Sequence, residues 1–158
     1  FAERGVTTID QLRDLASEEE NGEETCKLII SQNSPNDKID IEEKWQRICE
    51  AANRYPSIQL SAAKIGPTTV QVILERDIEE DESVSPYVDA LNFPIVKTEN
   101  WYILVSDELD ELLSIQKVAF ERKEEVLIEL DSAEMNKPLR IYLFCDSYVG
   151  CDRVCDVQ

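Results

Sequence analysis

The stretch FCDSYVGCD, residues 144–152, places two cysteines near the end of a 158-residue chain that contains no histidine. Zinc sites and redox centres typically pair cysteines that are separated by two residues. The last three cysteines here are separated by five and then three residues, which disfavours either kind of centre. The stretch instead predicts a strand that ends in a turn at Gly150, with Phe144 and Tyr148 packed inward and the cysteines acting as small hydrophobic side chains.

The composition limits which partners the chain can have. Its formal net charge is −18, and residues 1–56 carry 13 acidic and 7 basic side chains, while residues 57–158 carry 21 and 9. A nucleic-acid-binding protein normally presents a basic face, so we expect this chain not to bind nucleic acid directly. No apolar run is long enough to predict a membrane span, and five cysteines, an odd number, favour a reducing intracellular compartment. Because Phe1 follows no methionine, we expect the sequence to be part of a longer protein.

The first 56 residues follow a helical pattern. Thr7 or Thr8 is the predicted N-cap, with Gln11 at the capping-box position of Thr8, and a second short helix is expected between residues 17 and 30. A third helix is predicted by apolar residues that recur at the helical period and should form one buried side: Ile41, Trp45, Ile48 and Ala52, with Cys49 beside them.

After Pro56 the hydrophobic period changes to two. The predicted strands are 57–64, 68–76, 101–106, 112–120, 124–131 and 139–145, with turn signals at 66–67 and 136–138. The acidic run 75–82 lacks the spacing of a calcium loop and is expected to be a solvated loop. We therefore predict an α+β chain: a helix-loop-helix domain of three short helices over residues 1–56, then an antiparallel immunoglobulin-like β-sandwich over residues 57–158.

The chain lacks the motifs of common catalytic sites. It has no glycine-rich phosphate loop, and without histidine it lacks the usual base of serine and cysteine triads. Carboxylates are so frequent that no acid–base pair can be selected from the sequence. We expect no catalytic, cofactor-binding or metal-binding residues and no enzymatic activity in this chain.

Three motifs in sequence order carry a resemblance to a known family. They are NRYPSIQL at 53–60, NWYILVSDELDELLSIQKV at 100–118 and CDSYVGCD at 145–152. Together they resemble the C-terminal part of the Sec-sixty-three homology unit, which occurs in large Ski-two-like RNA helicases and in a translocon subunit of the endoplasmic reticulum. The matching residues are Asn53, Arg54, Tyr55, Pro56, Trp101, Asp107, Leu112, Leu113, Ile115, Asp146, Tyr148, Gly150, Cys151 and Asp152. Two departures are Ser106, where the pattern usually has glycine, and Arg153-Val154-Cys155 in place of Gln-Glu-Tyr.

The resemblance implies a helix-loop-helix followed by an immunoglobulin-like or fibronectin-type sandwich. It is greatest to the spliceosomal member, which carries two tandem helicase cassettes and unwinds paired small nuclear RNAs. This implies a non-catalytic scaffold module in the nucleus, with ATP and Mg²⁺ used by RecA-like domains outside this chain. The implied partners are adjacent helicase domains and splicing factors, including the largest scaffold protein of the spliceosome. The alternatives are a cytosolic adaptor of the endoplasmic-reticulum translocon and a ribosome-rescue or coactivator helicase.

The matched residues favour structural roles. We expect Trp101, Leu113 and Tyr148 to be buried, because a small sandwich needs large side chains in its core. Asp107 and Asp146 stand next to turns, where their carboxylates can accept backbone hydrogen bonds. The sequence does not indicate which residues contact a partner.

Overall fold

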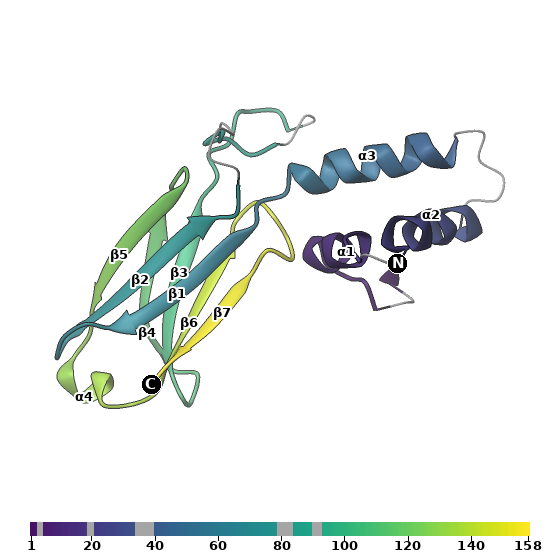
Figure 1. Cartoon of the computed structure of the whole chain (residues 1–158). Coiled ribbons are helices and arrows are strands. Elements are labelled where there is room, and N and C mark those ends of the chain that lie inside the picture. Colours follow the sequence, from purple (N-terminus) through teal and green to yellow (C-terminus); the bar gives the residue numbers. More distant parts are fainter. Residues whose placement is uncertain (3–4, 19–20, 34–39, 79–83, 90–92) are drawn as a thin grey trace. The chain divides into compact units, whose positions relative to one another are not determined.

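The computed structural model describes residues 1–2, 5–18, 21–33, 40–78, 84–89 and 93–158. The chain divides into two compact units, Phe1–Pro56 and Ser57–Gln158, which are described separately below. Helices dominate the described residues of the first unit and antiparallel strands those of the second (Figure 1), so the predicted α+β class is confirmed. None of the helices within the described ranges is long and apolar enough to cross a membrane.

The first unit contains α1 (Ile9–Ala16), α2 (Gly22–Asn33) and α3 (Ile41–Asn53). The predicted capping box at the start of α1 is present, because the Thr8 hydroxyl accepts the Gln11 N–H and the Gln11 side chain accepts the Thr8 N–H, both at 3.2 Å. Helix α2 begins where the chain passes close to the end of α1. A Cβ on Gly22 would lie 2.3 Å from the Leu15 carbonyl oxygen, so only glycine fits there.

A small core holds the helical unit together. Its buried members are Leu12, Cys26, Ile30 and Trp45, and Ile48 and Cys49 pack against them. The predicted buried side of α3 is therefore largely confirmed by Trp45, Ile48 and Ala52. Ile41 is an error in that prediction: it is 38% exposed, because it is the first residue of α3 and the helix end leaves its side chain open to solvent.

The second unit is a sandwich of two antiparallel sheets with one short helix. Its elements are β1 (Ile58–Lys64), β2 (Thr69–Arg76), β3 (Trp101–Asp107), β4 (Leu112–Val118), β5 (Lys123–Glu129), α4 (Ser132–Met135), β6 (Leu139–Cys145) and β7 (Arg153–Val157). The strand orders are β1-β2-β5 and β4-β3-β6-β7. All six predicted strands are present, β6 with the predicted bounds and the other five with shifted ends, whereas β7 and α4 were not predicted. Each of these two is five residues or shorter, which gives too few periods for a pattern to be recognised.

The core of the sandwich follows from the strict alternation of its strands. Val70, Val72 and Leu74 of β2 face inward and are fully buried. The same strand continues through Glu75 and Arg76, as the predicted strand 68–76 required, so these first two residues of the acidic run do not lie in a loop. Residues 79–82 of the acidic run lie outside the described residues.

Strand β6 corrects a second expectation. Leu139, Ile141, Leu143 and Cys145 alternate inward, which places Phe144 on the outer face of the sheet. There its ring stacks on Tyr102 of the paired strand β3, with centroids 5.2 Å apart and 11° between the planes. The prediction that Phe144 packs inward is therefore wrong, because its neighbour Cys145 takes the inward position.

Candidate protein-interaction site

The motif after β6 holds the end of that strand to the segment before β3. The Asp146 carboxylate lies 3.2 Å from the Lys97 ammonium and accepts hydrogen bonds from the Ser147 hydroxyl at 2.6 Å and the Asn100 amide at 3.3 Å. Partial burial raises the pKa of Asp146, but these bonds outweigh it and leave the pKa below its ordinary value. Asp146 therefore joins two chain segments as well as shaping a turn.

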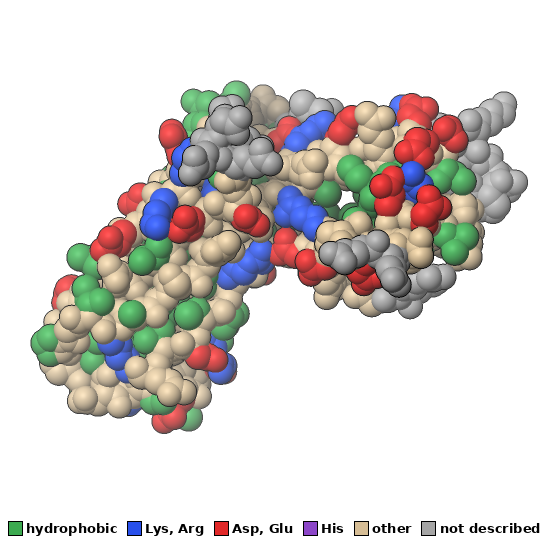
Figure 2. Space-filling model, in the orientation of Figure 1, with side chains coloured by type: hydrophobic (Ala, Val, Ile, Leu, Met, Phe, Trp, Pro, Cys, Tyr) green, Lys and Arg blue, Asp and Glu red, His purple; other side chains and the backbone are tan. Residues whose placement is uncertain are grey.

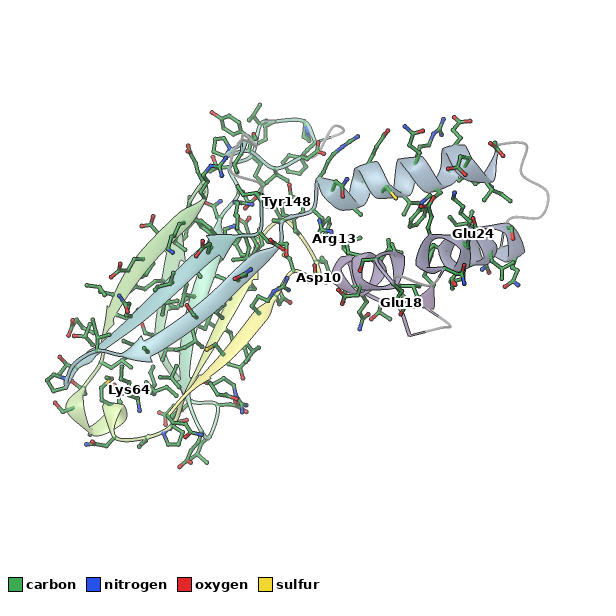
Figure 3. The ribbon with its side chains drawn as sticks, viewed as in Figure 1. Asp10, Arg13, Glu18, Glu24, Lys64 and Tyr148 are labelled. Atoms are coloured by element: carbon green, nitrogen blue, oxygen red, sulfur yellow. The ribbon has the colours of Figure 1, made fainter. Side chains whose placement is uncertain are left out.

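Tyr148 and Gly150 complete this connection. The half-buried Tyr148 hydroxyl accepts the Asp89 N–H at 2.8 Å, and burial raises the pKa of the phenol. Gly150 has φ +87°, a conformation that side chains strongly disfavour, so the turn expected there requires glycine. Figure 3 shows Tyr148 and Lys64 toward opposite ends of the sandwich, and the Lys64 ammonium donates to the Lys137 carbonyl at 2.8 Å.

Cys145 and Cys151 meet beneath this turn. Both are buried free thiols, and the Cys151 Sγ donates to the Tyr148 carbonyl at 3.4 Å. A hydrogen bond between the two thiols lowers the pKa of Cys145 to about 7 and raises that of Cys151. Asp152, the last residue of the motif, is exposed. The described residues contain no group of three or more cysteine, aspartate or glutamate side chains that could hold a metal ion.

Asp107 organises the hairpin between β3 and β4. It is only 2% exposed, and one carboxylate oxygen accepts the N–H groups of Leu109 at 2.9 Å and Glu111 at 3.0 Å. Hydrogen bonds from Glu111 and Leu109, together with the Lys137 ammonium 3.5 Å away, lower the pKa of the carboxyl. Asp110 in the same turn has φ +60°.

The link motif ends α3 in the helical unit, and the described structure places Arg13 beside it. Asn53 is the last residue of α3, and Pro56 is buried. The Arg13 guanidinium donates to the carbonyl oxygens of Ala52 and, at 2.8 Å, of Tyr55. A cation is favourable at this end of a helix, where carbonyl groups lack partners. Figure 3 labels Arg13 on α1, together with Asp10, whose carboxylate lies 3.4 Å from it. Sequence reasoning missed Arg13, because the two segments are far apart in the chain.

A buried ion pair in the sandwich was also missed. The carboxylate of Glu99 contacts the Arg76 guanidinium and accepts the Trp101 indole N–H at 2.6 Å. Arg76 also lies over the Phe120 ring, 5.2 Å from its centroid. The signal was available, since Arg76 continues the inward alternation of Val70, Val72 and Leu74.

Trp101, Leu113 and Ile115 of the central motif differ in exposure. Trp101 is fully buried, Leu113 is half-buried, and Leu112 and Ile115 are each 55% exposed. The register of the sheet explains this difference. Ile115 pairs with Leu104, and both face away from the core.

A row of apolar side chains crosses all four strands on the outer face of the four-stranded sheet. Register places Ile115, Leu104, Tyr142 and Val154 in one row, and Tyr102 and Phe144 in the next. Ile115 and Val154 are more than half exposed, and the others are half-buried. The outer face of an antiparallel sandwich is usually polar, because it meets water. We call these six residues the apolar face.

A groove of about 460 Å³ lies on the apolar face. Its apolar lining includes Leu104, Leu112, Tyr142, Phe144 and Val154, and its polar lining comprises Ser106, Asp110, Asp152 and Arg153. Ser106 lies at a β-bulge between β3 and β4, and its buried hydroxyl has no hydrogen-bond partner within the described part of the chain. Figure 2 shows acidic and basic side chains interspersed on the surface that is in view, with hydrophobic areas between them.

Residues 13–158, which include nearly all of both units, match the family described as the Sec63 Brl domain. This chain belongs to the Sec63 Brl domain family. The resemblance stated from the three motifs is thereby confirmed.

Relatives of this Brl domain are parts of much larger proteins. The DExH-box ATP-dependent RNA helicase DExH12 of Arabidopsis thaliana is 33% identical over 95% of this chain, and the pre-mRNA-splicing factor brr2 of Schizosaccharomyces pombe is 32% identical over 67%. The U5 small nuclear ribonucleoprotein 200 kDa helicase of Homo sapiens is 27% identical over 96%. The Brl domain spans 7%, 5% and 7% of the lengths of these three relatives.

A solved structure of a β-glucuronidase from glycoside hydrolase family 2 shares 10% identity with the Brl domain. It covers 63% of this chain and 11% of its own, with a TM-score of 0.34. A similarity of that size does not bear on function.

Proposed function

We propose that this chain is a non-catalytic protein-interaction module of a nuclear ATP-dependent RNA helicase that acts in pre-mRNA splicing. The observation that carries the proposal is the apolar face on a domain whose relatives include a pre-mRNA-splicing factor and a U5 ribonucleoprotein helicase. Large exposed apolar areas on soluble domains are typical of protein-binding surfaces. The net charge of −18 disfavours RNA as the direct ligand.

The proposed partners are the adjacent domains of the helicase and other splicing factors, including the largest spliceosomal scaffold protein. We also propose that residues 1–56 and 57–158 are separate domains, a helix-loop-helix and an immunoglobulin-like sandwich, as the two compact units suggest. In this proposal the helicase motor, with its ATP and Mg²⁺, lies in other parts of the protein.

The experiment is affinity capture from nuclear extract with the full chain as bait, quantified by mass spectrometry against a bead control. We expect enrichment of U5 ribonucleoprotein components. Enrichment of translocon channel proteins from solubilised microsomes, with no splicing factor from nuclear extract, would support the translocon adaptor instead. A parallel assay should find no ATP turnover by the chain above a buffer control, and turnover by a preparation free of other ATPases would refute the non-catalytic role.

A coactivator-type helicase is the second candidate. A protein of Dictyostelium discoideum described as activating signal cointegrator 1 complex subunit 3-like is 30% identical over 92% of this chain. The same capture experiment distinguishes the two candidates, because enrichment of that complex in place of U5 components would favour this one.

A further inference from the structure

We propose that the groove on the apolar face binds a segment of a partner protein that carries aliphatic side chains next to lysine or arginine. This inference rests on the proposed function and specifies its surface and its ligand chemistry. Its support comes from the register of the sheet, the lining of the groove and the charge at one end of the groove.

The aliphatic side chains of the apolar face do not contribute to the core of the sandwich. Inward positions of the same strands already supply the core, with Ile103, Val105 and Ile141 fully buried. Leu104, Tyr142 and Val154 alternate with these and face outward, in one row across three strands. Each exposed aliphatic side chain costs free energy that binding would recover, at about 25 cal/mol for each Å² of apolar area removed from water.

The groove has a suitable size and lining for side chains of a partner. Its volume of about 460 Å³ exceeds that of any single residue, so it can accept two or three aliphatic side chains of one segment. Leu104 and Tyr142 lie on the two central strands, while Leu112 and Val154 come from the edge strand β4 and from β7.

The groove also holds a polar group that is unsatisfied in the described chain. The Ser106 side chain is 5% exposed, lines the groove, and makes no hydrogen bond to any described residue. Leaving a buried hydroxyl unpaired costs free energy. Because the oxygen has almost no accessible surface, it is not a direct contact for the bound segment.

Charge selects the kind of segment. The hairpin at one end of the groove exposes Glu108, Asp110 and Glu111, and Asp110 itself lines the groove and accepts the Tyr142 hydroxyl at 3.3 Å. Nearby, Arg140 is already held by Asp156 at 2.8 Å, and Asp110 lies 3.9 Å from it. The Arg153 guanidinium donates to the carbonyl groups of Ile58 and Asp152, which engages it within the sandwich. This end of the groove therefore favours a cationic segment.

The same charges disfavour other occupants. A second copy of this chain would bring another net charge of −18 to the contact, and a nucleic acid would bring phosphates. An acidic peptide would meet the acidic hairpin. A segment that combines aliphatic and basic side chains is the occupant that fits both the lining and the charge.

The direct test uses the full chain, labelled with ¹⁵N, and three short synthetic peptides. One alternates leucine with lysine, one alternates serine with lysine, and one alternates leucine with glutamate. We expect the first to bind at least about tenfold more tightly than either of the others, which is about 1.4 kcal/mol. Amide shifts should concentrate at Leu104, Tyr142 and Val154. Equal binding of the serine–lysine or leucine–glutamate peptide, or shifts centred elsewhere, would overturn the proposal.

Matched variants distinguish binding at the apolar face from nonspecific hydrophobic binding. Val154→Ser and Ile115→Ser remove side chains that are 56% and 55% exposed and keep the charge of the chain. Leu127→Ser is the control, because Leu127 is 52% exposed and lies on the outer face of the other sheet. We expect a five- to tenfold loss of leucine–lysine binding, or about 1 kcal/mol, for each of the first two and less than about twofold for the control. Equal losses for all three would refute the proposal.

A charge variant tests the acidic end of the groove. Asp110→Asn keeps the left-handed backbone conformation, which asparagine tolerates, and it removes one carboxylate. We expect weaker binding of the leucine–lysine peptide and a smaller dependence on salt, whereas Glu125→Gln on the opposite sheet leaves both unchanged. An unchanged salt dependence for Asp110→Asn would contradict the role given to the hairpin.

The peptide titration tests the groove assignment and the affinity capture tests the proposed function, so either proposal can fail without the other. If the peptide binds the apolar face but no splicing factor is captured from extract, the proposed function is wrong and the groove assignment stands. If splicing factors are captured equally by the native chain and by Val154→Ser with Ile115→Ser, the module binds them elsewhere and the groove assignment is wrong.

Discussion

The two outer faces of the sandwich differ in the polarity of their side chains. On the sheet β1-β2-β5, polar groups pair across strands: the Gln71 amide donates to Glu125 at 2.8 Å, and Lys123 lies 2.9 Å from Glu75. On the sheet β4-β3-β6-β7, the equivalent positions hold Leu104, Tyr142 and Val154. The first face pairs polar side chains across its strands and exposes Leu127 among them, whereas the second exposes a continuous row of apolar side chains.

This difference distinguishes the strand positions that folding constrains from those that are available for binding. Both sheets alternate with period two, and both supply buried side chains to one core. Folding therefore constrains only the inward positions, and the outward positions are free to differ. An apolar outward row adds little to the core and points to a partner.

The largest loss of stability is expected from the buried Arg76–Glu99 pair, which belongs to neither outer face. Arg76→Met leaves the Glu99 carboxylate without its cation and should lower the free energy of unfolding by about 3–5 kcal/mol, measured by urea denaturation. The double variant Arg76→Met with Glu99→Gln should recover part of the loss, because no unpaired charge remains. A single variant as stable as the native chain would show that the pair does not hold the two sheets together.

The next largest change in stability is expected from a comparison of one substitution on each outer face. Phe144→Ala removes the ring stacked on Tyr102 and should cost about 1–3 kcal/mol of stability. Leu127→Ala on the polar face should change stability by less than about 1 kcal/mol, because its side chain is already half exposed. Thermal denaturation of both variants tests the comparison, which fails if Leu127→Ala is the more damaging.

A smaller effect is expected within the polar face. Lys123→Ala breaks the pair with Glu75, whose two side chains are both more than half exposed, and should cost less than about 1 kcal/mol. The remaining difference from the native chain should disappear in about 1 M salt, because such salt screens exposed charges. A large, salt-independent loss would mean that this face depends on its ion pairs more than its exposure indicates.

The smallest expected change is the titration of a single thiol, that of Cys145, which faces inward from β6. Because its pKa is lowered to about 7, Cys145 should become a thiolate as the pH rises through 7, while burial raises the pKa values of Cys26 and Cys49 and keeps them protonated. Thiolate absorbance near 240 nm should show this step, and Cys145→Ser should remove it. Cys151→Ser should move the step to higher pH if the hydrogen bond between the thiols is its cause.

Parts of the fold with several repeats of a pattern could be predicted from the sequence. The capping box at Thr8 and the alternation of Val70, Val72 and Leu74 were recognised correctly. The same approach missed β7 and placed Phe144 inward, because a short strand and a strand end contain too little pattern to fix which face is buried. It also missed Arg13 and the pair Arg76–Glu99, since those contacts join segments distant in the chain.

The sequence by itself determined the change from helices to strands at Pro56, the acidic charge and the family, because these depend on local periods, composition and motifs. Only the tertiary structure decided that Ile115, Leu104, Tyr142 and Val154 form one row. Directly opposed residues on paired strands lie about 5 Å apart whatever their separation in sequence. Strand order and register, which no single segment encodes, therefore created the apolar face.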